Sequence, residues 1–426
     1  MKQTEIGLIP DDWEVKRLGE LGEPCMCKRI LKEQTSPTGD IPFYKIGTFG
    51  GIQDAYISRE LFEQYKEQYN YPKKGTLLLS AAGTIGRVVV FDGKDSYFQD
   101  SNIVWIDNDE TKVTNDFLFY CYSRMQWKTE EGGIVSRLYN ANLKSTSFIA
   151  PKSLAEQERI AKALSDVDAL ISTTEKLIQK KKNIKQGAMQ NLLTGKKRLP
   201  GFGDKQTDLF VPNGTHTKEV KDVSPEQIRL SAKMKQTELG EIPEDWEVKS
   251  LGEISTIIMG QSPKSDCYNT QKGMVLIQGN ADISNRKTIC RFYTTHITKT
   301  ARKGDVIFTV RAPVGNVAKA TFDCCLGRGV CAIQRISDFL YYYLIFIEDS
   351  WSKTSTGSTF DSINSDTLAS TLIIQPSSKE EQTAIANVLS SMDKEIETLN
   401  TKLVKYRNLK TAMMQQLLTG KVRLVK

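Results

Sequence analysis

Histidine and cysteine, on which most nucleophilic and zinc chemistry depends, are sparse and scattered in this chain. The 426 residues include two histidines, His216 and His296, and neither has a nearby cysteine or serine that would make it part of a catalytic set. The Cys25-x-Cys27 and Cys324-Cys325 pairs lack a second cysteine or histidine pair at metal-binding spacing. The sequence therefore argues against a histidine-based triad and against a zinc site.

Two acidic clusters are the next candidates for catalysis, and they occur at corresponding places in a repeated segment. An Asp-x-Glu-x-Lys pattern covers residues 12–16 and returns at 245–249. Two carboxylates beside a lysine could hold Mg²⁺ and position a water, as in some metal-dependent nucleases. The first acid of those nucleases lies many residues upstream, however, and here each cluster surrounds a tryptophan, Trp13 or Trp246. We therefore expect these residues to serve packing or partner contact.

Cofactor-binding motifs are missing as well. The Leu-Leu-Thr-Gly-Lys strings that end at Lys196 and Lys421 match part of a phosphate-binding loop, but its first glycine is absent and no serine or threonine follows the lysine. No Gly-x-Gly-x-x-Gly follows a predicted strand, and the Asn-Pro-Pro-aromatic and Asp-Pro-Pro-aromatic segments of adenine-methylating enzymes do not occur. We expect a non-catalytic chain.

Composition and charge set the broad class of the protein. A length of 426 residues exceeds one ordinary core, and 39% hydrophobic with 26% charged residues is typical of a soluble globular protein. A net charge of +7 allows a nucleic-acid partner without requiring one. No secretory signal follows Met1, the densest apolar run (339–347) is too short to cross a bilayer, and the eight cysteines are scattered. We expect a cytoplasmic protein.

The chain contains a long-range internal repeat. Residues 1–20, MKQTEIGLIPDDWEVKRLGE, return almost unchanged at 234–253 as MKQTELGEIPEDWEVKSLGE. A second pair of segments begins PKSLAEQERIAKAL at Pro151 and PSSKEEQTAIANVL at Pro376, and ends MQNLLTGKKRL and MQQLLTGKVRL. Between these segments the halves share little. Each half therefore has a divergent body between a similar opening and a similar closing segment.

Both closing segments are predicted to be long helices. Ser153-x-x-Glu156 and Ser378-x-x-Glu381 have the form of capping boxes, and Gly195 and Gly420 stand where a C-terminal cap belongs. Roughly 40 residues lie between those ends, or about 60 Å of helix. We expect each helix to span most of its closing segment.

The apolar residues of these helices form a heptad seam, which favours an antiparallel coiled coil with an approximate two-fold axis. Thr174 and Lys181 interrupt the seam of the first helix and could fix its register. The alternative is two amphipathic helices, each packed on its own body. The seam residues are Ile160, Leu164, Val167, Ile171 and Ile178 in the first helix, and Ile385, Leu389, Met392, Ile396, Leu399, Leu403 and Tyr406 in the second.

We expect both bodies to be α/β. Strands are predicted at 76–79, 87–91, 305–310 and 317–322, and short helices at 115–124 and 338–346. The polar, turn-rich segment after the first long helix is predicted to be a linker with one short helix capped at Ser224. The boundaries are 1–152 for the first body, 153–200 for the first helix, 201–233 for the linker, 234–377 for the second body and 378–426 for the second helix.

The ordered set of motifs resembles the specificity subunits of type I restriction-modification enzymes. The resemblance rests on the duplicated G-x-I-P-x-D-W-E-V-K-x-L-G-E opening, the P-x(4)-E-Q-x-x-I-A helix start and the L-L-T-G-K-x-R-L helix end, and it covers the whole chain. It implies two target recognition domains on a coiled-coil spacer, each reading one half of an asymmetric bipartite DNA sequence. It also implies two methyltransferase and two restriction (translocase-nuclease) subunits as partners. S-adenosylmethionine, ATP and Mg²⁺ would then sit on those partners, with no cofactor on this chain.

Candidate DNA contacts follow from residue type beside turn signals, because lysine and arginine bind phosphates while arginine, asparagine and glutamine reach base edges. For each residue the alternative is an ordinary surface or turn position. The rival functions are a stand-alone DNA-modifying enzyme, which the missing motifs disfavour, and a coiled-coil adaptor that binds only proteins. The candidates are Lys45, Arg87, Gln99, Asn102, Arg137, Asn142 and Lys144 in the first body, and Gln278, Asn280, Arg311, Asn316, Arg328 and Asn364 in the second.

Overall fold

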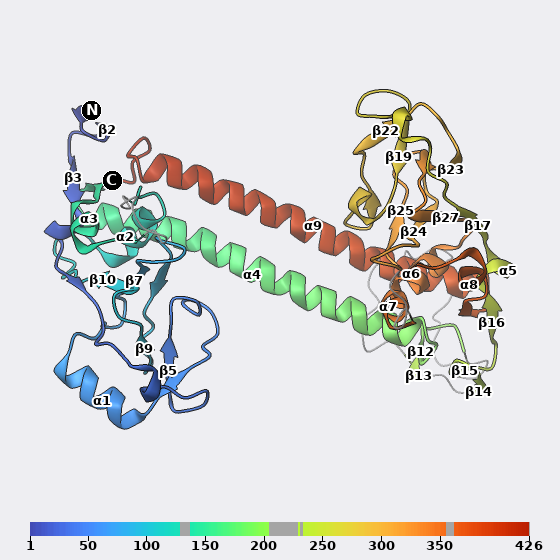
Figure 1. Ribbon diagram of the computed structural model, residues 1–426, viewed down its shortest axis with the longest axis horizontal. Helices are drawn as coiled ribbons and strands as arrows, with labels where there is room; N and C mark the ends of the chain where they lie inside the picture. Colours follow the sequence, from blue (N-terminus) through green and yellow to red (C-terminus); the bar gives the residue numbers. More distant parts are fainter. Residues whose placement is uncertain (128–136, 204–228, 231–232, 355–361, 426) are drawn as a thin grey trace, which may run out of the picture. The chain divides into compact units, whose positions relative to one another are not determined.

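The computed structural model describes residues 1–127, 137–203, 229–230, 233–354 and 362–425 (Figure 1). Most of the predicted linker, including the short helix expected at Ser224, lies outside these residues. Among the helices of the described part, none is both long enough and apolar enough to span a bilayer.

The chain divides into two compact units. Unit 1 comprises Met1–Glu175 and Thr401–Lys426, and unit 2 comprises Lys176–Asn400. Each unit therefore contains one body together with a segment of both long helices.

The two predicted long helices are present. They are α4 (Leu154–Leu192) and α9 (Lys379–Leu417), each of 39 residues and about 58 Å long. Gly195 and Gly420 follow them, both with a φ of +68°, the left-handed conformation that favours glycine at a helix end. The predicted C-terminal caps are confirmed.

The predicted seam lies on the buried side of each long helix. Ile160, Leu164 and Leu389 are fully buried, and the other seam residues are buried or half-buried. Thr174 is also buried, and its hydroxyl donates to the Leu170 carbonyl at 2.6 Å, so the polar group on the seam is satisfied within its own helix.

The capping-box prediction is half right at Ser378 and wrong at Ser153, where the Glu156 amide donates to the backbone carbonyl of Ser153 at 3.1 Å. The Ser378 hydroxyl accepts a hydrogen bond from the Glu381 amide at 3.2 Å, as predicted. The Glu381 carboxylate does not close the box but binds an arginine, and the Glu156 carboxylate does the same. A charged partner satisfies a buried carboxylate better than a single backbone amide, so neither glutamate returns to the backbone amide of its serine.

The body of unit 1 is built on two sheets (Figure 1). A four-stranded antiparallel sheet has the order β4-β10-β7-β8, and a three-stranded sheet has the order β6-β5-β9, in which β5 and β9 are parallel. The predicted strands at 76–79 and 87–91 correspond to β7 and β8. The bounds are β4 Pro24–Cys25, β5 Ile41–Tyr44, β6 Tyr56–Ile57, β7 Leu77–Ser80, β8 Val88–Val90, β9 Tyr97–Phe98 and β10 Ile103–Ile106.

The remaining elements of unit 1 connect this body to α4. A hairpin of β1 and β2 precedes β3, which pairs antiparallel with β11 at the start of α4. The helix predicted at 115–124 is α2, and the Thr114 hydroxyl caps its N-terminus. The bounds are β1 Lys2–Thr4, β2 Gly7–Ile9, β3 Trp13–Arg17, β11 Ser147–Pro151, α1 Arg59–Gln68, α2 Asn115–Tyr122, α3 Asn140–Ser145, and the 3₁₀ turns η1 Leu18–Glu20 and η2 Lys32–Gln34.

Unit 2 carries two larger sheets. Their orders are β17-β27-β24-β25-β21-β20 and β18-β22-β19-β26-β23, and β19 runs parallel to β26 as β5 does to β9. The predicted strands at 305–310 and 317–322 correspond to β24 and β25. The bounds are β17 Thr256–Met259, β18 Tyr268–Asn269, β19 Met274–Ile277, β20 Ile283–Ser284, β21 Lys287–Thr288, β22 Phe292–Thr294, β23 Lys299–Ala301, β24 Val306–Thr309, β25 Val317–Lys319, β26 Cys324–Leu326 and β27 Val330–Gln334.

The connecting elements of unit 2 repeat those of unit 1. The hairpin of β14 and β15 corresponds to β1 and β2, and the pair of β16 and β28 corresponds to β3 and β11. The helix predicted at 338–346 is α6 with those bounds. The bounds are β12 Lys197–Arg198, β13 Arg229–Leu230, β14 Met234–Thr237, β15 Gly240–Pro243, β16 Trp246–Ser250, β28 Leu372–Pro376, α5 Leu251–Ile254, α6 Asp338–Phe346, α7 Glu348–Thr354, α8 Ser365–Ala369, and the 3₁₀ turns η4 Ser265–Cys267 and η5 Asn280–Asp282.

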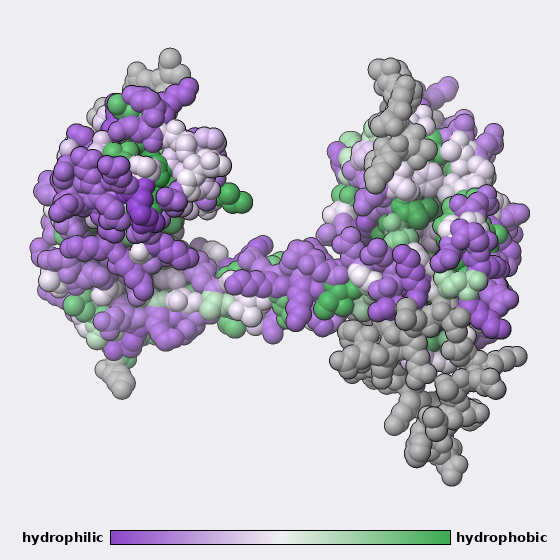
Figure 2. All heavy atoms as spheres, turned by 90° about the horizontal axis from the view of Figure 1, so that it is seen from below, coloured by the Kyte–Doolittle hydropathy of each residue, from purple (hydrophilic) through white to green (hydrophobic). Residues whose placement is uncertain are grey.

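Each unit has two cores. One joins the body to the helix ends, around Trp13 in unit 1 and Trp246 in unit 2, and the other fills the sheet farther from the helices. The exterior is mostly hydrophilic on the face that Figure 2 shows. The apolar area buried in these cores is what stabilises the elements that carry the surface loops.

Candidate nucleic-acid interface

Side chains tie three loops of unit 1 together at one end of its strands. Gln99, between β9 and β10, accepts a hydrogen bond from the Ile46 amide in the loop after β5 at 2.8 Å. Arg87, after the turn between β7 and β8, donates from Nη1 to the Phe49 carbonyl at 2.8 Å. Because β5 and β9 are parallel, the loops that follow them leave at the same edge.

Two further candidates join this group. Arg137 forms an isolated β-bridge with Ala82 in the β7–β8 turn and donates from Nη2 to the Ser101 carbonyl at 3.0 Å. Asn102 is half-buried, and its backbone carbonyl accepts from the Ala81 amide at 2.8 Å. We call these loops, residues 45–50, 81–87 and 99–102 with Arg137, the unit 1 loop cluster.

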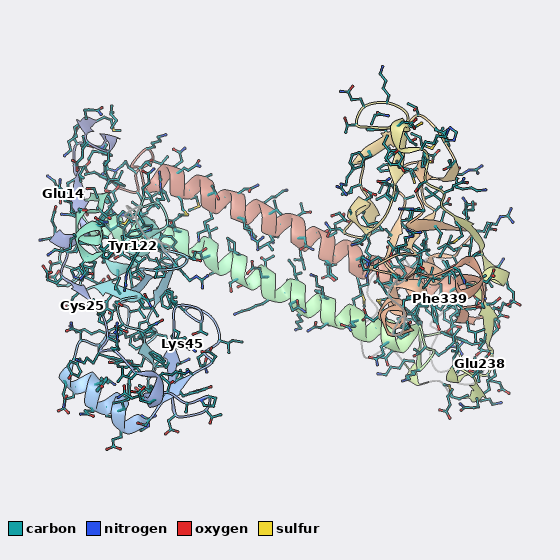
Figure 3. All side chains as sticks on the ribbon, in the orientation of Figure 1. Glu14, Cys25, Lys45, Tyr122, Glu238 and Phe339 are labelled. Carbon is teal, nitrogen blue, oxygen red and sulfur yellow. The ribbon has the colours of Figure 1, made fainter. Side chains whose placement is uncertain are left out.

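The other three candidates of unit 1 divide between this cluster and a helix. Lys45 lies in the cluster, where its ammonium pairs with Asp54 at 2.8 Å and its side chain is 42% exposed (Figure 3). Asn142 and Lys144 lie on α3, and Lys144 pairs with Glu23 at 2.8 Å. Helix α3 contacts η1 and β4, so the structure does not bring these two residues to the loops.

Unit 2 gathers its candidates in the same way. Asn316, after the β24–β25 turn, donates from Nδ2 to the Asn280 side chain in the loop after β19 at 2.6 Å. Gln278 begins that loop, and the β26–β27 turn that carries Arg328 approaches it closely. A Cβ on Gly329 would lie 2.2 Å from the Gln278 carbonyl oxygen, so only glycine allows this approach.

The last two candidates of unit 2 involve the segment that follows α7: Arg311 pairs with it, and Asn364 lies on it. Arg311 is exposed in the β24–β25 turn and forms a β-bridge with Ser362. The Asn364 side chain accepts from the Thr367 amide at 2.8 Å and thereby caps α8. We call residues 278–282, 310–316 and 327–329 with Ser362 the unit 2 loop cluster. Asn364 is not part of this cluster, because its side chain caps α8.

The acidic side chains of the opening segments form ion pairs within their units. Glu14 pairs with Lys16 at 2.5 Å and Glu247 with Lys249 at 2.8 Å, within single strands. Among the described residues, no three His, Cys, Asp or Glu side chains are placed to hold a metal ion. Figure 3 shows Glu14 well apart from Lys45 within unit 1.

Sequence reasoning missed an arginine that binds two carboxylates at the base of each unit. In unit 2, Arg198 donates to both oxygens of Glu381 at 2.6 Å and to Asp245 at 2.8 and 2.9 Å. Its guanidinium lies 5.9 Å from the ring centroid of Trp246, whose indole donates to Glu381 at 3.2 Å. We call these four residues the unit 2 clamp.

The unit 1 clamp repeats this arrangement. Arg423 donates to Glu156 at 2.7 and 2.8 Å and to Asp12 at 2.8 and 2.5 Å, and it lies 5.7 Å from the ring centroid of Trp13. The hydrogen bond from the arginine lowers the pKa of Asp12 below its ordinary value, and Arg198 does the same to Asp245. Each clamp joins the end of one long helix to the start of the other.

Ion pairs between the two long helices occur inside each unit. In unit 1, Asp168 and Glu175 of α4 bind Lys410 and Arg407 of α9, both at 2.6 Å. The numbers rise along α4 while they fall along α9, so the two segments run in opposite directions.

The same order holds in unit 2. Lys181, predicted to set the register, binds Glu395 at 2.6 Å, and Lys185 binds Asp393 at 2.5 Å. These ion pairs, one of them at the seam position Lys181, favour one alignment of the two helix segments over its neighbours.

Comparisons with known proteins agree with this architecture. The family model of the type I restriction modification DNA specificity domain matches residues 10–185 and 243–405, two copies in tandem. The MjaX specificity subunit of a type I restriction enzyme from Methanocaldococcus jannaschii is 31% identical over 443 residues, 99% of this chain and 96% of that protein. A specificity subunit from Haemophilus influenzae is 58% identical over 160 residues, which span 38% of this chain and 41% of that relative.

A solved structure has the same fold. The crystal structure of a type I restriction-modification S subunit from M. genitalium matches 98% of each chain with a TM-score of 0.59 at 14% identity. The matched family model covers most of the chain, and the MjaX relative covers nearly all of it. The chain therefore belongs to the family of type I restriction-modification specificity subunits.

Proposed function

We propose that this chain is the non-catalytic DNA reader of a type I restriction-modification complex. Each body would read one half of an asymmetric bipartite target. The observation that carries the proposal is that both units gather arginine, asparagine and glutamine on strand-end loops, joined by Lys45 in unit 1, while the bodies themselves differ. Those side chains suit base edges and phosphates, and differing bodies suit different half-sites.

The proposal includes the domain organisation. Residues 1–152 and 234–377 would be target recognition domains 1 and 2, 153–200 and 378–426 the spacer helices, and 201–233 the linker. An antiparallel coiled coil with an approximate two-fold axis is supported by the opposed order of the ion pairs and by the duplicated clamps.

The repeated mountings support the expected partners. Two methyltransferase subunits would find equivalent surfaces on the two halves, and two restriction subunits would complete the complex for cleavage. The cofactors S-adenosylmethionine, ATP and Mg²⁺ would sit on those partners in the cytoplasm. The rival functions, a stand-alone modifying enzyme or a protein-only adaptor, are outcomes of the test below.

Methylation mapping in cells tests the proposal. The full chain is co-expressed with the methyltransferase subunit of its own system, and methylated adenines are mapped with and without the chain. We expect one asymmetric two-part motif with a fixed gap to appear only when both are present. Methylation by the chain alone would favour the modifying enzyme. Unchanged methylation together with no salt-dependent binding of duplex DNA would favour the adaptor.

A further inference from the structure

One turn is built alike in both loop clusters. The Ser80 hydroxyl accepts a hydrogen bond from the Arg87 amide at 2.9 Å, and the Thr309 hydroxyl accepts one from the Asn316 amide at 2.9 Å. Each hydroxyl donates in turn to a carbonyl within its own turn. The backbone of residue 87 is therefore fixed in the same way as that of residue 316.

A tryptophan rests against each of these turns. Gly86 and Gly315 have φ of +88° and +97° and lie directly before the fixed residue. A Cβ on Gly86 would come within 2.4 Å of the Trp127 indole nitrogen, and one on Gly315 within 2.8 Å of Trp351 Cδ1. The ring leaves no room for a side chain at the glycine, so the next residue is the first that can vary.

The variable residue reaches the same neighbouring loop in both units. Arg87 donates to Phe49 in the loop after β5, and Asn316 donates to Asn280 in the loop after β19. The bond to Phe49 uses one of the five N–H donors of the guanidinium, and Arg87 is an exposed residue. Asn316 is half-buried, and its bond uses one amide hydrogen.

We propose that Arg87 and Asn316 are equivalent specificity-determining residues, with Arg87 reading guanine in one half-site and Asn316 reading adenine in the other. This inference rests on the proposed function. Arginine makes paired hydrogen bonds to guanine O6 and N7, and asparagine makes them to adenine N6 and N7. The same backbone frame would thus present a different side chain to each half-site of the DNA.

A purely structural role for these side chains makes a different prediction. A side chain that only holds two loops together would affect the affinity for every DNA sequence equally. A side chain that contacts a base sets the base preference at one position of the target. Two conservative variants separate these roles. Arg87→Gln keeps an N–H donor for Phe49, and Asn316→Asp keeps the shape while the Asn280 amide can turn to donate.

The test is selection of a randomised duplex DNA library by the full chain co-purified with its methyltransferase subunit. Arg87→Gln should lose about 5- to 150-fold of guanine preference at one position of one half-site and shift toward adenine, with the other half-site unchanged. Asn316→Asp should lose adenine preference in the other half-site by a similar factor and shift toward cytosine. Arg59→Gln, an exposed arginine on α1, should match the wild type.

The outcomes are distinct. Unchanged base profiles in both variants, or an equal loss of affinity for all sequences, would overturn the inference while the wild-type motif still supports the proposed function. A wild type that selects no bipartite motif would count against the proposed function itself. Thermal unfolding checks each variant, and where one fails to fold the other decides by the same criterion.

Discussion

The two clamps use the same residue types but differ in how far water reaches them. The Arg198 side chain of the unit 2 clamp is 4% exposed, and that of Arg423 in the unit 1 clamp is 24% exposed. The Trp246 indole donates to Glu381, whereas the Trp13 indole nitrogen is buried with no hydrogen-bond partner among the described residues. The two clamps therefore have the same four residue types but differ in solvent exposure and in the hydrogen bond of the indole.

The chain around Arg198 explains the difference. Strand β12, which contains Arg198, pairs with β13, and Gly203 comes so close that a Cβ there would lie 3.3 Å from Arg198 Nη1. This cover removes water from the guanidinium, and a lower local dielectric strengthens each charge interaction while raising the cost of an unpaired charge. The contribution of each clamp to the free energy of unfolding therefore depends on the chain that shields it from water as well as on its own residues.

The largest expected effect comes from removing the arginine of each clamp. Arg198→Ala leaves Glu381, 1% exposed, as a buried charge without its partner and should lower the free energy of unfolding by about 3–5 kcal/mol. Arg423→Ala leaves Glu156, which is also 1% exposed, but water already reaches the place of the 24% exposed guanidinium, so the change should cost about 1–3 kcal/mol. Urea unfolding followed by tryptophan fluorescence measures both, because a tryptophan lies in each clamp.

Arg17→Ala is the matched control for this pair. Its side chain is 57% exposed and lies 3.8 Å from Glu5, so the change should stay within about 0.5 kcal/mol. Equal losses in the two clamp variants would contradict the claim that the cover sets the difference.

A smaller and equal effect is expected at the helix ends, where the units do not differ. Gly195→Ala would place its Cβ 2.5 Å from the Pro243 ring, and Gly420→Ala 2.5 Å from the Pro10 ring, each at a φ of +68°. The left-handed backbone and the crowding should cost about 1–3 kcal/mol in each variant. Thermal unfolding of the two proteins side by side is the measurement, and a large cost in one alone would show that the caps are not equivalent.

The smallest effect concerns pH. Arginine hydrogen bonds lower the pKa of Asp12 and Asp245 in the folded chain. A lowered folded pKa contributes stability that is complete above the unfolded pKa, about 3.9, and is lost as the pH falls through the folded value. Both side chains are 62% exposed, so Asp12→Asn and Asp245→Asn should each cost less than about 1 kcal/mol at neutral pH.

Urea midpoints measured from neutral pH down to about pH 3 test this prediction. Each Asn variant should lose less stability than the wild type as the acid range is entered, because its share is already gone. A wild type and variants that lose stability in parallel would exclude a contribution from these aspartates.

Local and periodic features were predictable from the sequence. Helices α4 and α9 follow from caps and heptads, because their signals lie within a few residues of one another. The loop clusters were reached through residue type beside turn signals, which placed Arg87 and Asn316 among the candidates. The helix predicted at 338–346 matched α6 because an apolar run follows a serine cap.

The clamps were not predictable in the same way. Arg198 and Glu381 are 183 residues apart, and Arg423 and Glu156 are 267 apart, so no local pattern links them. Each carboxylate also had a plausible local role, in a capping box, that concealed the distant one. The available signal was the arginine that both repeats carry after the helix end, Arg198 and Arg423. An arginine that is repeated at the same place and becomes buried there needs a charged partner.

Position in the fold also decided what residue type could not. Asn364 is of a residue type that often contacts bases, but it precedes helix α8 and caps its N-terminus. Lys144 has the charge of a phosphate contact, but Glu23 lies within 2.8 Å of it. Both residues were chosen by residue type, whereas their neighbours in the fold engage their side chains in a helix cap and an ion pair.

The central claim is that each body reads its own half-site, and duplication of one body tests it most directly. Residues 234–377 are replaced by a second copy of 1–152, joined at the equivalent positions before Ser378 and Ser153, and methylated adenines are mapped in cells with the methyltransferase subunit. The account predicts that the asymmetric motif becomes an inverted repeat of the first half-site with a fixed gap. A hybrid that folds, methylates DNA and keeps the original asymmetric motif would contradict it.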